Sequence, residues 1–198
     1  MALGDSYTIG TGLPDESQNF PTLLARRLTA ATGMGVALTN LGVNGYTATD
    51  LIREELPVVR SLRPELLTIL IGANDAVQGT SEAAYRTRLG TIYDALVGLG
   101  LAATRILSVS TPDFSGLPGA RPFGAARDLR TRIEAFNGVA LVEASARHFH
   151  YADISAITRE ESKGRDWLAP DGLHPGPAQH RAIADQLWAL IRPTMKNR

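Results

Sequence analysis

The sequence of 198 residues contains no cysteine. This absence excludes disulfide bonds, cysteine-ligated metal sites and a cysteine nucleophile. The chain also lacks an excess of either charge, because 20 Lys and Arg residues balance 20 Asp and Glu residues and no basic block stands out. A neutral chain of this kind argues against nucleic acid or an anionic membrane surface as the main partner.

Long apolar runs are missing as well. No stretch of about 18 consecutive apolar residues occurs, so neither a transmembrane helix nor stable membrane insertion is predicted. No secretory signal precedes Gly4, and the chain as given therefore predicts a cytoplasmic protein. The first strand would begin almost at Met1, so a longer natural N-terminus stays open as an alternative. The sequence predicts no particular oligomeric state.

What the chain does have is a globular composition, with 44% hydrophobic and 20% charged residues. Its length suits one domain over residues 1–198. Short apolar stretches, which are typical of buried strands, alternate with amphipathic helical stretches. The five expected strands are the run that ends at Gly4 and residues 36–41, 65–71, 105–109 and 149–154. This alternation predicts an α/β fold, a three-layer αβα sandwich with a flavodoxin-like five-stranded parallel sheet in the order 2-1-3-4-5.

One expected helix and one expected loop bear on the site. Pro57 is expected to kink or divide the helix that follows the second strand, because proline has no N–H for the helical ladder. Residues 110–124, which follow the fourth strand, are too rich in Pro and Gly for regular structure. A loop of that length is usually functional.

Polar residues follow the expected strands at the end where a parallel sheet binds its ligands. Gly4-Asp5-Ser6 closes the first strand, and taken alone it fits a plain turn as well as a nucleophile. A serine hydroxyl is a weak nucleophile that needs a base, and the base needs an orienting group. Asp171 and His174 supply both within four residues, because a loop can fold the carboxylate back onto one ring nitrogen.

Acyl transfer also needs hydrogen-bond donors for the developing oxyanion. The candidates are the backbone N–H of Ser6, the unobstructed backbone N–H of Gly45 and the side-chain amide of Asn74. The nucleophile, the donors and the base with its orienting group then come from several loops at one edge of the sheet. Asp5 is expected to be a structural hydrogen-bonding residue in the turn.

Four blocks together resemble the SGNH, or GDSL-type, hydrolases. They are Gly-Asp-Ser-Tyr at 4–7, Asn-Gly at 44–45, Gly-Ala-Asn-Asp at 72–75 and Asp-Gly-Leu-His at 171–174. They occur in the family's order and span the chain, and the full set is far more specific than any single block. One departure is Tyr7, where the name-giving motif has Leu; that position is not catalytic.

The resemblance implies a serine ester hydrolase. Ser6 would be the nucleophile, with Asp171 and His174 completing the triad. Ser6, Gly45 and Asn74 would form the oxyanion hole. No metal and no organic cofactor would be needed, and the partner would be a small-molecule ester.

Alternatives stay open at this point. The same triad would serve an acyltransferase or a thioesterase. The hydroxyl- and glycine-rich segment 6–12 could instead cradle a phosphate or FMN in a non-catalytic binding module. His148 and His150 lie two residues apart and could chelate a metal, but no third ligand stands at a telling spacing, so no metal site is predicted.

The acyl pocket is expected at the loop 110–124. Its position after the fourth strand places it on the side of the site, and Phe114, Leu117 and Phe123 would give it an apolar wall. Since the chain has no long apolar lid segment, small or short-chain esters are expected to be better substrates than emulsified fat. His180, on the last helix, is interpreted as a surface or packing residue.

Overall fold

The computed structural model describes residues 1–160 and 164–195. Its sheet contains four parallel strands in the order β1-β2-β3-β4. The strands are β1 (Ala2–Gly4), β2 (Leu67–Leu70), β3 (Ile106–Val109) and β4 (His150–Ala152). Their last residues pair in one row across the sheet, Gly4 with Leu70, Leu70 with Val109 and Val109 with Ala152. The carboxyl ends of all four strands therefore open onto the same edge.

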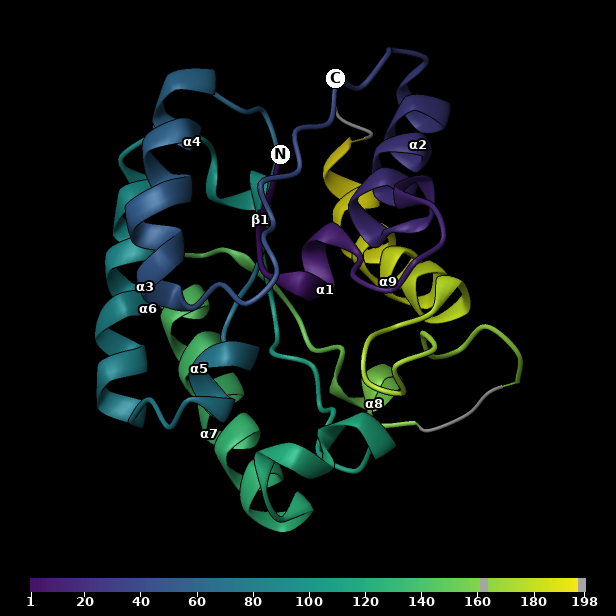
Figure 1. Cartoon of the computed structure of the whole chain (residues 1–198). Coiled ribbons are helices and arrows are strands. Elements are labelled where there is room, and N and C mark those ends of the chain that lie inside the picture. Colours follow the sequence, from purple (N-terminus) through teal and green to yellow (C-terminus); the bar gives the residue numbers. More distant parts are fainter. Residues whose placement is uncertain (161–163, 196–198) are drawn as a thin grey trace.

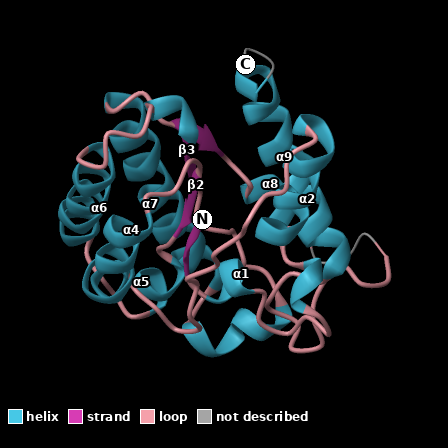
Figure 2. Cartoon of the chain, turned by 90° about the horizontal axis from the view of Figure 1, so that it is seen from above, coloured by secondary structure: helices cyan, strands magenta, loops and turns pink. Residues whose placement is uncertain are grey.

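Helices cover both faces of this sheet (Figures 1 and 2). One layer holds α1 (Ser6–Ile9), α2 (Phe20–Thr32), α8 (Ser155–Thr158) and α9 (Pro177–Met195). The other holds α3 (Ala48–Asp50), α4 (Leu56–Leu62), α5 (Ala73–Val77), α6 (Glu82–Val97) and α7 (Ala126–Ala146). Short turns complete the chain: η1 (Glu16–Gln18), the π-helical η2 (Leu51–Glu55), η3 (Ala103–Arg105) and η4 (Pro118–Phe123). The predicted three-layer α/β fold is confirmed.

The core lies between the sheet and the two helical layers. Every residue of β2 and β3 is buried, as expected for parallel strands covered on both faces. Helix α6 buries a stripe made of Tyr85, Leu89, Ile92 and Leu96. Within residues 1–160 and 164–195, none of the helices combines the length and apolarity that crossing a bilayer requires.

The predicted second strand, residues 36–41, is not a strand, and the described sheet has four strands instead of five. The segment does run beside β1, where the predicted order puts it, but it forms a single bridge between Ala2 and Asn40. The next donor along β1, the N–H of Gly4, donates to the side chain of Glu55 over 3.0 Å. This bond takes the place of a ladder bond, so the pairing ends after one bridge.

The segment after Ser6 is also not the open loop that its glycines suggest. It forms the short helix α1, in which the Asp5 carboxylate accepts from the N–H of Tyr7 at 3.0 Å, as expected for a structural residue in the turn. Gly10 ends the helix with a φ of 91°. Four helical residues are too few to show a helical period in the sequence.

Pro57 lies in the first turn of α4, and the helix is divided just before it, which is one of the two outcomes expected for this proline. The preceding turn, η2, is π-helical, and the N–H of Leu56 donates to the carbonyl of Leu51. Proline cannot donate to the ladder, and a wider turn before it is one way to accommodate that gap. The turn carries Glu55 inward, where it is 2% exposed.

Two further local expectations need correction. The loop 110–124 is not wholly irregular, because it contains the 3₁₀ turn η4. His148 and His150 do not share a strand face, since His148 adopts a φ of 58° in the turn before β4. This removes the geometric basis for chelation by that pair.

Candidate active site

Ser6 is the first residue of α1 and directly follows the turn that ends β1. Its backbone N–H is one of the donors that a helix leaves free at its start. The residue is 4% exposed. Among the described residues, neither its Oγ nor its N–H has a hydrogen-bond partner. Both groups are therefore available to a molecule bound at the sheet edge.

Asp171 and His174 form the pair that their spacing predicts. The Nδ1 of His174 lies 2.6 Å from the Oδ2 of Asp171. The other oxygen, Oδ1, accepts from the amides of Leu173 and His174 at 2.9 and 3.0 Å. Burial acts to raise the pKa of Asp171, but hydrogen bonds from the His174 ring and these amides outweigh it and hold that pKa below its ordinary value. The ionised carboxylate thus orients the ring and leaves Nε2 without a hydrogen-bond partner among the described residues.

The imidazole of His174 lies beside the turn that carries Ser6. The rings of Tyr7 and His174 lie 5.3 Å apart between centroids. No hydrogen bond joins His174 to Ser6 among the described residues, and catalytic hydrogen bonds are often long until substrate binds. Gly12 lets the two loops approach, because a Cβ there would lie 2.7 Å from the Cβ of Ala169.

Gly45 and Asn74 come from neighbouring loops that a hydrogen bond joins. The Nδ2 of Asn74 donates to the carbonyl of Tyr46 at 2.9 Å, which uses one amide hydrogen and leaves the second. Gly45 has a φ of 86°, a conformation that favours glycine, and a Cβ there would meet nothing within 4 Å. The glycine is thus required by its backbone angle and not by crowding.

The side chain of Asp75 joins the two loops by hydrogen bonds, a role that sequence reasoning missed. It is fully buried, and its Oδ2 accepts from the N–H of Ala48, the first residue of α3, at 2.7 Å. Its Oδ1 accepts from Arg88 at 3.0 Å. This pairing fixes the start of α3 against the loop that carries Asn74. The second acid of the Gly-Ala-Asn-Asp block was the available signal.

A pair of buried carboxyl groups, Asp5 and Glu55, lies next to the turn that carries Ser6, and sequence reasoning missed Glu55. Asp5 is fully buried, and burial, with a contribution from the charge of Asp75, raises its pKa to about 7. Burial and the neighbouring charge of Asp5 raise the pKa of Glu55 to about 8. At neutral pH this pair therefore holds at least part of its protons.

The loop 110–124 packs directly on the loop that carries Asp171 and His174. The N–H of Gly119 donates to the carbonyl of Gly172 at 3.0 Å. Of the three predicted pocket residues, Phe114 and Leu117 are each 3% exposed, whereas Phe123 is 41% exposed. Phe114 stacks on Tyr7 and meets Phe123 edge-on. An aromatic row thus leads from the imidazole to the surface.

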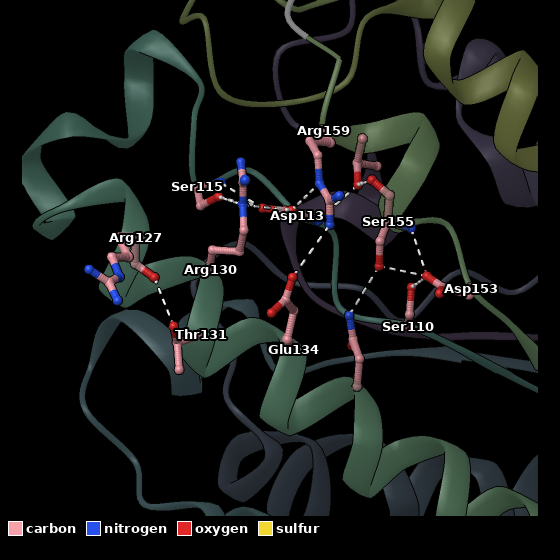
Figure 3. Close-up of polar contacts among 12 residues, drawn as sticks. Ser110, Asp113, Ser115, Arg127, Arg130, Thr131, Glu134, Asp153, Ser155 and Arg159 are labelled. Carbon is pink, nitrogen blue, oxygen red and sulfur yellow. Dashed lines mark hydrogen bonds and ion pairs between the residues drawn. The ribbon is translucent and has the colours of Figure 1, made fainter.

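A polar cluster anchors the start of this loop (Figure 3). The side chains of Arg130 and Arg159 converge on the buried Asp113, with nitrogen to carboxylate distances of 3.5 and 2.6 Å. Asp113 also accepts from the hydroxyl of Ser115 at 2.6 Å. Burial acts to raise the pKa of Asp113, but the hydrogen bonds from Ser115 and Arg159 outweigh it and hold the pKa low. Glu134 adds a longer contact of 3.7 Å to Arg159.

Other candidate groups lie outside this arrangement. His180 is fully buried and its Nδ1 accepts from the N–H of Phe20, so it is a packing residue; burial lowers its pKa to about 3. A cavity of about 640 Å³, lined in part by Arg60, Arg63 and Asp94, lies where the chain enters β2 and β3, at the opposite edge from Ser6. In the described part of the chain, no three His, Asp or Glu side chains gather closely enough to hold a metal ion.

Comparisons with known proteins agree with this fold. The esterase TesA of Pseudomonas aeruginosa is 22% identical over 196 residues, which covers 98% of this chain and 88% of that protein. The arylesterase of Vibrio mimicus is 24% identical over 185 residues, which covers 93% of this chain and 84% of that protein. The crystal structure of the lipase/acylhydrolase from Enterococcus faecalis shares the fold, with a TM-score of 0.75 at 24% identity over 98% of this chain and 94% of that chain.

The model of one protein family matches nearly the whole chain. The match extends over residues 2–182 and includes all four sequence blocks described above. It agrees with the esterases among the relatives, which align over almost their full length. The chain therefore belongs to the GDSL-like lipase/acylhydrolase family and is a serine ester hydrolase of that type.

Proposed function

We propose that this protein hydrolyses small or short-chain carboxylic esters through an acyl-enzyme on Ser6. His174 acts as the general base and Asp171 orients it. The oxyanion is bound by the N–H groups of Ser6 and Gly45 and by the side-chain amide of Asn74.

The reaction follows from these roles. The Oγ of Ser6 attacks the ester carbonyl carbon while the Nε2 of His174 takes the hydroxyl proton. The tetrahedral intermediate collapses, the carbon–oxygen bond to the alcohol breaks, and His174 returns the proton to the leaving alkoxide. Water then attacks the acyl-enzyme, gives its proton to His174 and releases the acid and Ser6. Atoms balance with water alone as the second reactant, so the proposal needs no metal or organic cofactor.

The observation that carries the proposal is the Asp171–His174 pair. Its 2.6 Å contact fixes the tautomer, because Nδ1 must donate to the ionised carboxylate and Nε2 is then the basic nitrogen. The ring lies against Tyr7, the residue next to Ser6. Asn74 supports the oxyanion role, since its bond to Tyr46 orients the amide and leaves one hydrogen for a ligand.

Replacing Ser6 by alanine tests the nucleophile. We expect Ser6→Ala to lower kcat for a p-nitrophenyl ester by at least about 1000-fold, because no other group can form the acyl-enzyme. A fluorophosphonate probe should label the wild-type protein at Ser6 and leave the variant unlabelled. Ser61→Ala, an exposed serine on α4, is the matched control and should keep full activity. Wild-type turnover by Ser6→Ala would overturn the proposal.

The acyl preference belongs to the same assay. Because Phe114 and Leu117 are buried, Phe123 is the member of the predicted wall that stands open to an acyl chain, and the wall is therefore short. A series of p-nitrophenyl esters of increasing acyl length, acetylated sugars and a lysophospholipid should show the highest kcat/KM for the short acyl groups. A kcat/KM that keeps rising into long acyl chains would contradict the short-chain assignment and leave the role of Ser6 standing.

A further inference from the structure

The last amide of β1 has an unusual partner. In a parallel pair, every second residue of one strand donates to and accepts from the two residues on either side of its partner. Ala2 does this with residues 39 and 41 over 2.9 Å, and the carbonyl of Gly4 accepts from Val43 at 3.2 Å. The ladder would then have the N–H of Gly4 donate to Leu41. That N–H donates instead to the Oε2 of Glu55, 51 positions along the chain, at 3.0 Å.

Backbone geometry makes this amide critical. Gly4 adopts a φ of 145°, and a Cβ there would lie 2.0 Å from the carbonyl oxygen of Leu70. Its peptide is therefore pressed against β2 on one side, and the carboxyl of Glu55 holds it on the other. The next two residues are Asp5, the N-cap of α1, and Ser6. The direction in which the chain leaves Gly4 sets the position of the Ser6 Oγ.

We propose that Glu55 is a positioning residue: its carboxyl oxygen holds the Gly4 N–H and thereby fixes the turn that presents Ser6. This inference rests on the proposed function, because it takes Ser6 as the nucleophile. Glu55 touches no reacting atom and acts through the backbone. The π-helical turn η2 places the side chain of Glu55 next to the Gly4 N–H.

The surroundings of Glu55 are consistent with a neutral acid. Its Oε1 and the Oδ2 of Asp5 are both buried without a hydrogen-bond partner among the described residues. The charge of Asp5, in the β1–α1 turn, acts on Glu55, and the charge of Asp75 of α5, which is paired with Arg88 of α6, acts on Asp5. Since burial and the charge of Asp5 raise the pKa of Glu55 to about 8, the carboxyl gains a charge beside another acid only in alkaline solution.

Two substitutions separate the acceptor from the charge. Glu55→Gln keeps a carbonyl oxygen for Gly4 and cannot ionise, whereas Glu55→Leu fills similar space and accepts nothing. At pH 7, we expect Glu55→Gln to keep kcat within about 3-fold of wild type and Glu55→Leu to lower it about 30- to 100-fold at a nearly unchanged KM, because a misplaced nucleophile reacts slowly. Glu54→Leu, an exposed neighbour, is the matched control and should behave as wild type.

The alkaline limb of the pH profile is the second readout. Above pH 8 the kcat of the wild type should fall as Glu55 ionises, and Glu55→Gln should stay flat. This comparison uses a variant that keeps the native hydrogen bond, so it holds even where Glu55→Leu does not fold. Wild-type kcat in a folded Glu55→Leu, or the same alkaline limb in wild type and Glu55→Gln, would overturn the inference.

Amide hydrogen exchange gives a readout independent of activity. In a Ser6→Ala background, the Gly4 amide should exchange at least about 100-fold faster in Glu55→Leu than in Glu55→Gln, because only the latter accepts its hydrogen bond. Full activity in Ser6→Ala would sink the proposed nucleophile. If Ser6→Ala is inactive but the Gly4 amide stays protected in Glu55→Leu, the role of Glu55 alone is contradicted.

Discussion

Buried acids lie in two places next to the candidate active site, and their pKa values are shifted in opposite directions. At the loop 110–124, Asp113 lies between Arg159 and Arg130, and its pKa is held low. Next to the turn that carries Ser6, Asp5 and Glu55 have no arginine on either carboxyl within the described residues, and burial raises their pKa values to about 7 and about 8. The first group is charged at neutral pH, and the second retains protons.

The difference follows from what each group supports. Asp113 anchors a surface loop, where half-exposed guanidinium groups can reach a buried carboxylate and stay hydrated. Asp5 and Glu55 lie behind the donors proposed to receive an oxyanion. A fixed negative charge there would oppose the charge that develops in the transition state, and a neutral acid supplies the same hydrogen-bond acceptor without that repulsion.

The largest expected effect comes from removing the charged member of this comparison. Asp113→Ala should lower the free energy of unfolding by about 3 kcal/mol, because it leaves two arginines without their shared acceptor and opens a buried polar site. Urea unfolding followed by circular dichroism measures it. Glu134→Ala also removes an acid near Arg159, but at 3.7 Å and largely exposed, and should cost less than about 0.5 kcal/mol. Equal losses for the two variants would break the comparison.

The pH dependence of stability should differ in sign between the two groups. The pKa values of Asp5 and Glu55 are raised above those of unfolded acids, so the folded state binds more protons between pH 4 and 8 and the free energy of unfolding falls as pH rises through that window. The pKa of Asp113 is lowered, so its contribution is lost as pH falls below about 4.

Glu55→Gln isolates one part of that dependence. Because glutamine does not titrate, the variant should lose about 1–3 kcal/mol less than wild type between pH 5 and 8 in urea unfolding. The slope that remains should belong mainly to Asp5. If the wild type and the variant changed in parallel, Glu55 would already be charged in the folded protein at pH 5.

The smallest expected effect is the difference in unfolding free energy between variants of Arg159 and Arg130. Arg159 reaches Asp113 at 2.6 Å, whereas Arg130 stands at 3.5 Å, and both are more than 40% exposed. Arg159→Gln should cost about 1 kcal/mol and Arg130→Gln less than about 0.5 kcal/mol in urea unfolding. A larger loss for Arg130→Gln would show that the network, rather than the short contact, holds the loop.

Much of the fold could be predicted because its signals are local. The apolar run before Gly72 and the stripe of α6 each lie in one continuous stretch of sequence. The contact of Asp171 with His174 was predictable for the same reason, since only two loop residues lie between them. Motifs whose parts are close in sequence need no knowledge of packing.

What could not be predicted depends on contacts between distant positions. The missing fifth strand reflects a hydrogen bond between Gly4 and Glu55, and nothing near residues 36–41 announces it. Asp113 finds Arg159 46 positions away for the same kind of reason. Such side chains look like surface charges until the fold brings them inside.

The carboxyl of Glu55 also limits strand pairing at the β1 edge of the sheet. A complete strand over residues 36–43 would offer a flat row of unpaired amides and carbonyls to another chain. Val36 and Val43 in this segment are 39 and 40% exposed and Met34 just before it is 59% exposed, so such a row would carry exposed apolar side chains. By occupying the Gly4 amide, one acidic side chain leaves this margin a poorer template for aggregation, and a variant that restored the ladder would lose that protection.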